Sequence, residues 1–198
     1  MAFDTKIFTE TSIASDCRTF LFAAVFDGHD GRHCAAFAQS RLWPGFQRHF
    51  HISGGNPVVA FQRAFYEIES GFGGTFTDEP SSQFAAACSA AVFIDAQSKP
   101  QRICVANIGT CRAVHSSGRQ VGATQITSEH SCENLSERLR IRHQHPDALQ
   151  SDSAKGLLGL YTHTRALGGL HMKDRRIAEL WNTQHFRRVH PLPGTTLT

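Results

Sequence analysis

Apolar residues along the chain fall into short runs that predict strands. Residues 20–26 form a continuous aromatic and β-branched run interrupted only by alanine, and an Asp-Gly pair ends it. A run of this kind predicts a strand buried on both faces. Residues 84–94 predict an alanine-rich strand, and residues 103–114 predict two strands joined by a short glycine-containing turn at residues 108–110. These runs together predict a β-sheet.

Two other stretches have the periodicity of helices. Asn56 followed by Pro57 is a favourable helix start, and apolar residues then recur at intervals of three and four, which makes one apolar stripe. Residues 31–42 predict another helix, which Pro44 and Gly45 end. Helices and strands together predict a mixed α and β fold. The stripe consists of Val58, Phe61, Phe65, Ile68 and Phe72.

Composition favours one soluble domain over residues 1–198, because 40% hydrophobic residues in 198 suffice for a core. The net charge of +3 and the dispersed basic residues predict no nucleic-acid partner. No apolar run reaches membrane-spanning length, and the N-terminus lacks the features of a signal peptide. We therefore expect no membrane insertion and an intracellular location, cytoplasmic or nuclear. The six cysteines form no CxxC pair, so we expect reduced, mostly buried thiols.

The sequence FAAVFDGHDG, residues 22–31, concentrates chemistry at one tight turn. Asp27 is expected where the buried strand meets solvent, and a carboxylate there can hold a hard cation. Gly28 would let its own carbonyl approach the same ion, and His29 can exchange protons near neutral pH. Asp-Gly after a strand is also ordinary turn chemistry, so this segment alone leaves both interpretations open.

Three further segments narrow the choice. Residues 103–114 read ICVANIGTCRAV, residues 127–141 contain TSEH and then ERLRI, and residues 159–169 read GLYTHTRALGG. In order and approximate spacing the four segments resemble the metal-dependent protein serine/threonine phosphatases, the type 2C or PPM family. The family forms are FxVxDGHGG, VANxGDSRAV, T-x-D-H, E-x-x-R-I and LxVSRALGD. The resemblance covers about residues 20–173 and implies an α+β fold, an antiparallel β-sandwich flanked by helices (αββα), here incomplete.

The resemblance also implies a mechanism. In that family two Mg²⁺ or Mn²⁺ ions share a water, and the activated hydroxide attacks the substrate phosphorus. Asp27 matches the aspartate that bridges the ions, and Gly28 matches the glycine whose carbonyl joins them. His29 matches the histidine that protonates the leaving seryl or threonyl oxygen. Asp4 lies at a plausible distance to match a further metal-binding aspartate on the preceding strand.

Other positions depart from the family pattern. Phe3 stands where the family has a glutamate before that aspartate, and Thr110 replaces the GDSR aspartate of an additional metal site, which we expect to be vacant. The family's later ligands, in DGxWD and in an Asp-Asn pair, have no match before Thr198. Two dications 4 Å apart repel by about 16 kcal/mol at an effective dielectric of 20, so a metal pair needs several carboxylates. We therefore expect metal binding that is weak or lost, and an impaired catalytic centre.

These patterns favour a pseudophosphatase, a binding or scaffold subunit with a protein partner such as a kinase, a phosphoprotein or a complex subunit. Unpaired sheet edges would offer that partner a docking place. Two alternatives stay open. One is an active Mg²⁺- or Mn²⁺-dependent protein serine/threonine phosphatase that recruits other acids, such as Asp147, Asp152 or Asp174. The other is a truncated fragment of such an enzyme.

Histidine pairs offer a different metal chemistry. His29 and His33 are four residues apart and could share a helical face as a zinc pair, and His143 and His145 could do so on a loop. Neither pair has an obvious third and fourth ligand in the sequence. Because the chain has 12 histidines, we expect both pairs to be structural or solvent-facing.

Overall fold

The computed structural model of the chain describes residues 3–11, 19–75, 84–99, 101–116, 118, 122–144 and 162–173. Its main sheet is antiparallel and runs in the order β1-β2-β3-β4, with β7 also paired to β3. Strands β5 and β6 form a separate two-stranded sheet. The strands are β1 (Phe3–Thr11), β2 (Thr19–His29), β3 (Ala86–Asp95), β4 (Arg102–Ile108), β5 (Val114–Ser116), β6 (Ala123–Gln125) and β7 (Leu167–Gly168). The helices are α1 (His33–Ile52), α2 (Pro57–Thr75), α4 (Leu135–Gln144) and α5 (Leu170–Lys173).

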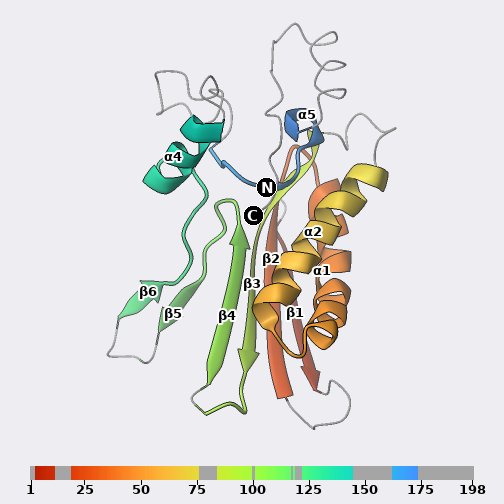
Figure 1. Cartoon of the computed structure of the whole chain (residues 1–198), viewed down its shortest axis with the longest axis vertical. Coiled ribbons are helices and arrows are strands. Elements are labelled where there is room, and N and C mark those ends of the chain that lie inside the picture. Colours follow the sequence, from red (N-terminus) through yellow and green to blue (C-terminus); the bar gives the residue numbers. More distant parts are fainter. Residues whose placement is uncertain are drawn as a thin grey trace, which may run out of the picture.

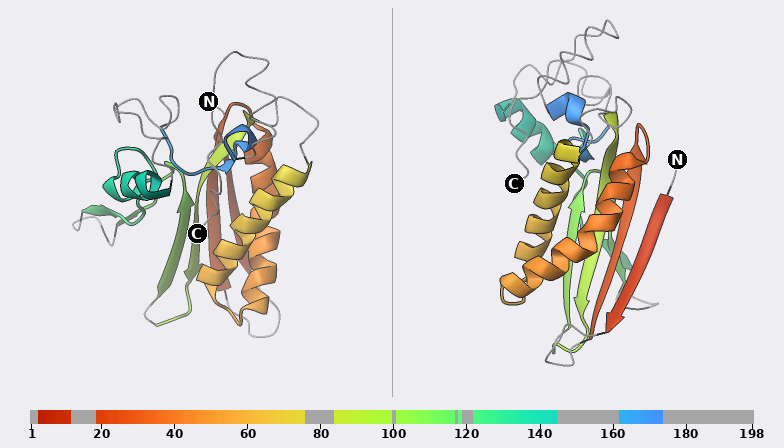
Figure 2. Two further views of the ribbon diagram at one scale, coloured as in Figure 1. Left: turned by 45° about the horizontal axis from the view of Figure 1, so that its top comes forward. Right: turned by 90° about the vertical axis from the view of Figure 1, so that its right-hand side faces the viewer.

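Helices α1 and α2 lie side by side and cover one face of the main sheet (Figures 1 and 2). The core between the two layers is built largely from phenylalanine. The ring of Phe22 on β2 lies 5.1 Å from that of Phe46 on α1 and 5.8 Å from that of Phe61 on α2. Phe93 on β3 joins the same cluster, with its ring 5.3 Å from Phe46. The predicted α+β class is confirmed, and the described residues contain one helix layer and one sheet layer.

The prediction that residues 20–26 are buried on both faces is wrong. Phe22 and Phe26 face the helices and are buried, whereas Leu21 and Val25 are 37% and 39% exposed. Side chains alternate between the two faces of a strand, and among the described residues the helix layer covers one face only. This alternation has a consequence for the site, because Asp27 falls on the same face as Leu21 and Val25.

Helix α1 is longer than the sequence predicts, since it continues through Pro44 and Gly45 to Ile52. A proline inside a helix costs about 3 kcal/mol relative to alanine. Phe46 and Phe50 follow the proline and are both buried in the core, and this burial offsets the cost. A Cβ atom at Gly45 would stand 3.4 Å from the Ala64 Cβ, so the glycine lets the two helices approach closely.

Helix α2 begins at Pro57 as predicted. The Asn56 side chain accepts hydrogen bonds from the main-chain N–H groups of Val58 and Val59, at 3.0 and 3.2 Å. The apolar stripe is buried from Phe61 onward, but Val58 is 53% exposed and does not belong to it.

Replacing Asn56 with alanine is expected to lower the free energy of unfolding by about 1 kcal/mol, because two N–H groups at the helix start lose their acceptor. Urea denaturation measures the change. Asn56→Asp is the matched control, since aspartate caps as well as asparagine, and its unfolding midpoint should stay near that of the parent chain. An equal loss in both variants would contradict the capping role.

The strand predicted over residues 84–94 is confirmed as β3. In the segment 103–114, β4 is the first predicted strand, but residues 109–113 form no strand and β5 begins only at Val114. Strand β5 pairs with β6 rather than with β4. Gly109, at the turn after β4, has φ +79°, and a side chain there would overlap that of Cys88. No helix in the described part of the chain has both the length and the apolar character to cross a membrane. A single domain over residues 1–198 stays a prediction.

Candidate metal and catalytic site

Asp27, Gly28 and His29 are the last three residues of β2, so the strand runs through the Asp-Gly pair that was expected to end it. The carboxylate of Asp27 lies 3.9 Å from the Nε2 atom of His29, and both side chains are partly exposed. A Cβ atom at Gly28 would stand 3.1 Å from the main-chain oxygen of Gly31 and 3.3 Å from the Ala35 Cβ. Gly28 therefore has a packing role, because it lets β2 turn closely into α1.

Asp4 lies on β1, next to the strand that carries Asp27. The register pairs Asp4 with Phe26, and Phe3 with Asp27. The side chains of β1 lie outside the described part of the structure, so Asp4 as a metal ligand stays a prediction. The alternative acids Asp147, Asp152 and Asp174 also lie outside the described residues.

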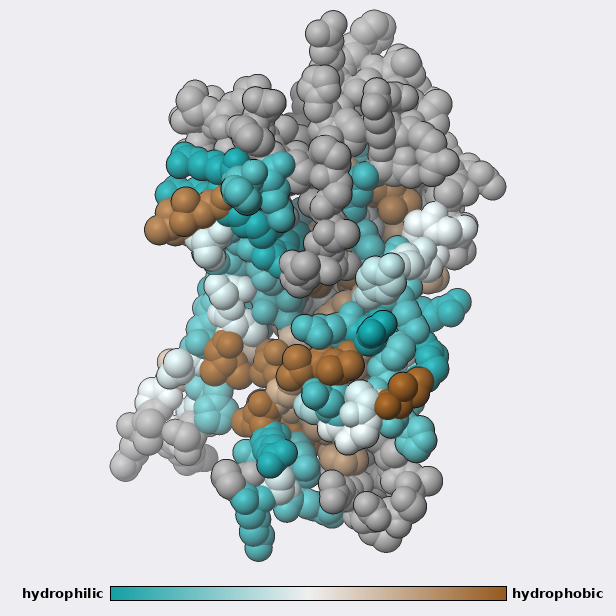
Figure 3. Space-filling view, in the orientation of Figure 1, coloured by the Kyte–Doolittle hydropathy of each residue, from teal (hydrophilic) through white to brown (hydrophobic). Residues whose placement is uncertain are grey.

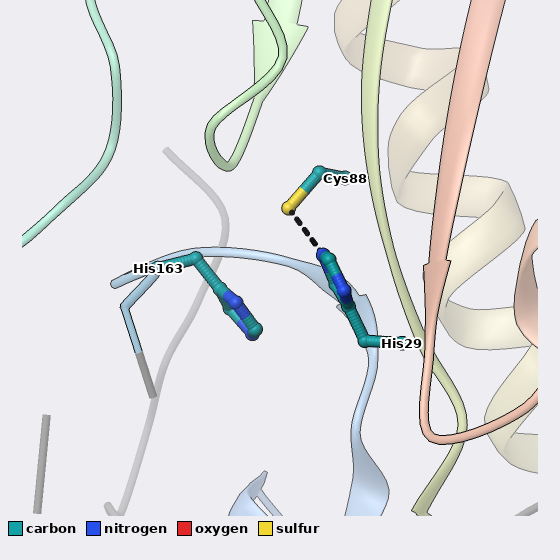
Figure 4. Close-up of side chains that lie close together, drawn as sticks. All are labelled: His29, Cys88 and His163. Atoms are coloured by element: carbon teal, nitrogen blue, oxygen red, sulfur yellow. Dashed lines mark hydrogen bonds between the residues drawn. The ribbon is translucent and has the colours of Figure 1, made fainter. Parts of the chain in front are cut away.

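Cys88 on β3 is the cross-strand partner of Asp27. Its Sγ atom lies 3.3 Å from the Nε2 atom of His29, within hydrogen-bond distance (Figure 4). The Cys88 side chain is fully buried. Burial raises the pKa of this thiol, and the negative charge of Asp27 adds to the effect. Cys88 is therefore a protonated thiol at neutral pH in the metal-free chain.

His163 approaches the same place from the segment before β7 (Figure 4). Its ring stacks on that of His29, with 4.9 Å between the centroids and 13° between the planes. Burial lowers the pKa of His163 to about 4, and electrostatic interactions with His29 and Lys173 contribute. The imidazole of His163 is therefore neutral at pH 7.

Cys111, in the loop after β4, is the fifth member of this group. Burial raises the pKa of its thiol to about 12, with further contributions from Cys88 and Asp27. The hydroxyl of Thr110 lies 3.8 Å from the Cys88 sulfur and donates to it. A vacant additional metal site at Thr110 stays a prediction. We call Asp27, His29, Cys88, Cys111 and His163 the Asp27 cluster.

The donors of the Asp27 cluster do not suit a pair of hard cations. Mg²⁺ and Mn²⁺ prefer oxygen ligands, and Asp27 is the one carboxylate of the cluster. Within the described ranges, one group of three or more His, Cys, Asp or Glu side chains is close enough to share an ion, namely His29, Cys88 and His163. Nitrogen and sulfur atoms, not carboxylate oxygens, are what the described residues bring together.

A buried ion-pair network fixes the segment that carries His163. Glu137 on α4 is 4% exposed. It accepts hydrogen bonds from Arg165 at 2.6 Å, from Arg140 at 2.9 Å and from the Thr164 hydroxyl at 2.7 Å. Burial alone would raise the pKa of Glu137, but these hydrogen bonds outweigh it and lower the pKa to about 2. The segment next to His163 is thus tied to α4.

The other end of the same segment is tied to α2. Glu69 accepts a hydrogen bond from the main-chain N–H of Gly168 at 2.9 Å and one from Lys173 Nζ at 2.6 Å. Lys173 also donates to the main-chain oxygen of Ala166. The TRALGG segment, residues 164–169, is therefore anchored on both sides, which positions His163 against His29.

His130, in the segment TSEH, has a structural role. Its Nδ1 atom accepts a hydrogen bond from the main-chain N–H of Gly109, and its own main-chain N–H donates to the Gly109 oxygen. The main-chain oxygen of His130 accepts from the N–H of Thr164 at 2.8 Å. His130 thus joins the turn after β4 to the TRALGG segment.

The His29–His33 pair does not exist as a helical face. His29 ends β2 and His33 is the first residue of α1, so the two belong to different elements. His145 lies outside the described residues. The side chains near His29 that could share an ion with it, Cys88 and His163, are distant in sequence, and the sequence patterns do not identify them.

An apolar groove of about 600 Å³ lies between α2 and β4. Figure 3 shows hydrophobic residues gathered in the middle of this face. His130 and Arg165 also line the groove, so it reaches the segments that position the Asp27 cluster. Its apolar lining includes Val58, Phe61, Phe65, Tyr66, Cys104, Ala106 and Ile108.

Comparison with known proteins identifies the family of the chain. The sequence model of the protein phosphatase 2C family matches residues 3–198. The chain therefore belongs to the protein phosphatase 2C family, whose members generally depend on Mg²⁺ or Mn²⁺.

Individual relatives are distant and longer. "Probable protein phosphatase 2C 78" of Oryza sativa subsp. japonica is 27% identical over 170 residues, which cover 79% of this chain and 42% of the relative. "Probable protein phosphatase 2C 36" of the same organism is 29% identical over 179 residues, which cover 85% and 45%. The chain thus spans a little under half the length of these relatives.

A solved structure described as that of a C. elegans sex determining protein shares the fold. The TM-score is 0.63 at 17% sequence identity, and the match covers 85% of this chain and 44% of that one. This likeness shows that the two chains share a fold over the matched part.

Proposed function

We propose that this chain is a pseudophosphatase, a phosphatase 2C domain that binds a protein partner and is impaired in Mg²⁺- or Mn²⁺-dependent hydrolysis. The observation that carries the proposal is the make-up of the Asp27 cluster. Asp27 is surrounded by two thiols and two imidazoles where a pair of hard cations requires several carboxylates.

The repulsion between two metal ions shows how much negative charge a metal pair needs. Two dications about 4 Å apart repel by about 16 kcal/mol at an effective dielectric of 20, and each carboxylate at a similar distance from one ion offsets about 8 kcal/mol. Cys88 and Cys111 are neutral thiols with raised pKa values, so they do not supply that negative charge. Binding of Mg²⁺ or Mn²⁺ to the described residues is therefore weak or lost.

The groove between α2 and β4 supports the binding role. It is large enough to receive apolar side chains of a partner, and its lining is mainly apolar. The opposite face of the sheet also exposes apolar side chains, among them Leu21, Val25 and Ile103. A kinase, a phosphoprotein or another subunit of a complex is the kind of partner we propose.

One observation favours the second candidate function, an active Mg²⁺- or Mn²⁺-dependent serine/threonine phosphatase. Asp27 and His29 keep the positions at the end of β2 that metal binding and leaving-group protonation would need, and both side chains reach solvent.

Phosphate release from a phosphothreonine peptide in the presence of Mn²⁺ decides between the two. The full chain is expected to release no more phosphate than its Asp27→Ala variant, with an active type 2C phosphatase as the positive control. Mn²⁺-dependent release that Asp27→Ala abolishes would contradict the impaired centre and establish the enzyme.

A further inference from the structure

We propose that His29, Cys88 and His163 form a binding site for one zinc ion, with three protein ligands and a fourth position left to water. The proposal does not depend on whether the chain is an active phosphatase. Cys88 and His163 lie 59 and 134 residues after His29 in sequence, and the fold brings the three together.

Distances between the ligand atoms carry the proposal. Zinc lies about 2.3 Å from cysteine sulfur and about 2.0–2.1 Å from histidine nitrogen, so in a tetrahedral site these atoms are about 3.3–3.6 Å apart. The sulfur of Cys88 lies 3.3 Å from Nε2 of His29, and one ligand atom of each of the three residues lies within 4.8 Å of the others. The His163 ring stacks nearly parallel to that of His29, so it must rotate, and its nitrogen must move by about 1 Å, to face an ion held by His29 and Cys88.

The scaffold holds each ligand from a different direction. His29 and Cys88 are on neighbouring strands, where the register pairs His29 with Ala86 and Cys88 with Asp27. His163 forms a β-bridge with Ser131. The network around Glu137 and the contacts of Glu69 fix the segment that follows. The backbone segments that carry the three ligands are thus held in place before any ion arrives, and this lowers the cost of binding.

The chemistry of the donors selects the metal class. One thiolate and two neutral imidazoles are typical of zinc, whereas Mg²⁺ and Mn²⁺ prefer oxygen. When zinc binds, the Cys88 thiol loses its proton to solvent and the sulfur forms the bond to the ion. Two imidazoles and one thiolate leave one position for water, and the partly exposed side of His29 gives the ion access.

Cys88 and His29 could also be read as a nucleophile and its base, but burial argues against that use. A reactive cysteine is partly exposed so that its thiolate can reach a substrate. The Cys88 side chain is fully buried between its strand neighbours, Thr110 and the turn at Gly109. A buried sulfur can coordinate a small ion that enters past His29, but it cannot attack a peptide or a phosphoprotein.

A zinc ion at this place would bear on catalysis, because it would occupy the imidazole of His29. The resemblance assigns that imidazole to protonation of the leaving group. Zinc binding therefore removes the proposed acid, and zinc would inhibit any phosphatase activity that the chain shows.

Metal titration of the full chain, purified reduced and free of metal, tests the site. Zinc is titrated in competition with a chromogenic chelator, and Co²⁺ is used as a spectroscopic substitute. We expect one zinc per chain above the weaker binding of surface histidines, and a sulfur-to-cobalt charge-transfer band. Cys88→Ala and His163→Gln are each expected to weaken zinc binding by at least about 100-fold, since even residues behind the ligands change affinity 10–100-fold.

Cys104→Ala and His115→Gln are the matched controls. Cys104 lies on β4 opposite Phe93, and His115 is exposed on β5. Both variants are expected to bind zinc as the parent chain does. Circular dichroism shows whether each variant is folded.

Each measurement has a result that would overturn the proposal of a zinc site. An unmodified chain that leaves zinc to the chelator, or that binds Co²⁺ without a sulfur band, has no such site. If Cys88→Ala or His163→Gln is folded and binds zinc as tightly as the parent chain, the site is also excluded. Should Cys88→Ala fail to fold, the cobalt spectrum of the unmodified chain and the His163→Gln titration still decide.

Discussion

Replacing Glu137 with glutamine is expected to lower the free energy of unfolding by about 3 kcal/mol at pH 7, close to the cost of breaking a buried ion pair by removing one partner. The substitution keeps the size of the side chain and removes its charge. Arg140 and Arg165 then lose the carboxylate that both of them contact. Chemical denaturation of the two chains at pH 7 measures the difference.

The loss should depend on pH in a definite direction. The pKa of Glu137 is lowered from 4.5 to about 2 in the folded chain. A lowered carboxyl pKa stabilises the folded state fully above the unfolded value, and this contribution is lost as the pH falls from about 4.5 towards about 2. A shift of this size corresponds to about 3 kcal/mol at neutral pH, in agreement with the mutational figure. The difference between the parent chain and Glu137→Gln is therefore expected to be constant from pH 7 to pH 5 and to shrink below that.

Glu133→Gln is the matched control for this prediction. Glu133 is exposed and precedes α4, and its substitution should change the stability by less than about 0.5 kcal/mol at any of these pH values. A difference between Glu137→Gln and the parent chain that did not shrink in acid would show that the carboxylate charge is not the source of the stability.

Alanine at Gly168 is expected to lower the free energy of unfolding by about 2–5 kcal/mol. Gly168 has φ +68°, a left-handed conformation that costs a residue with a side chain about 1–2 kcal/mol. A Cβ atom there would also stand 2.5 Å from the main-chain oxygen of Ala85 and 2.7 Å from the Cys34 sulfur. Overpacking of this kind typically adds about 1–3 kcal/mol. Because a main-chain oxygen within the sheet region cannot move aside easily, β7 should separate from β3.

The next residue provides the control. Gly169 has φ +61°, but a Cβ atom there would meet only the Ala86 Cβ, at 3.5 Å. Gly169→Ala therefore carries the conformational cost without the clash, about 1–2 kcal/mol. Equal unfolding midpoints for the two variants in urea would contradict the close approach at Gly168.

Local patterns predicted the elements well, and the reason is periodicity. The Asn-Pro start of α2 and its apolar stripe depend on residues within a few positions of one another, so the sequence contains them. The end of α1 could not be predicted in the same way. Pro44 is a strong local stop signal, and what overrides it is the burial of Phe46 and Phe50 against β2, α2 and β3, which lie far from the proline in sequence.

The candidate site likewise contains some residues that the sequence identifies and others that only the fold brings together. Asp27, Gly28 and His29 are adjacent in sequence, and a single motif places them together. Cys88 and His163 carry no motif of their own and reach His29 only through the pairing of β2 with β3 and the anchoring of the TRALGG segment. The role of Glu137 was likewise invisible, because ERLRI shows a charged helix segment while its partners Thr164 and Arg165 lie nearly thirty residues away.

These long-range contacts change the interpretation of the site. The DGH motif, residues 27–29, by itself suggests binding of a hard cation such as Mg²⁺ or Mn²⁺. Among the described residues, those that the fold adds to it are two thiols and a second imidazole, which suit a softer ion and carry little negative charge. The chain belongs to the protein phosphatase 2C family and has an α+β fold. The composition of the Asp27 cluster is the reason to propose that its metal centre is impaired.

Calorimetric titration of the metal-free full chain with Mn²⁺, repeated on Asp27→Asn, tests this account most directly. We expect no pair of tight Mn²⁺ sites, and at most one weak site that Asp27→Asn removes. Two tight Mn²⁺ sites that depend on Asp27 would show that the chain gathers enough carboxylates for a metal pair, and would contradict the impaired centre.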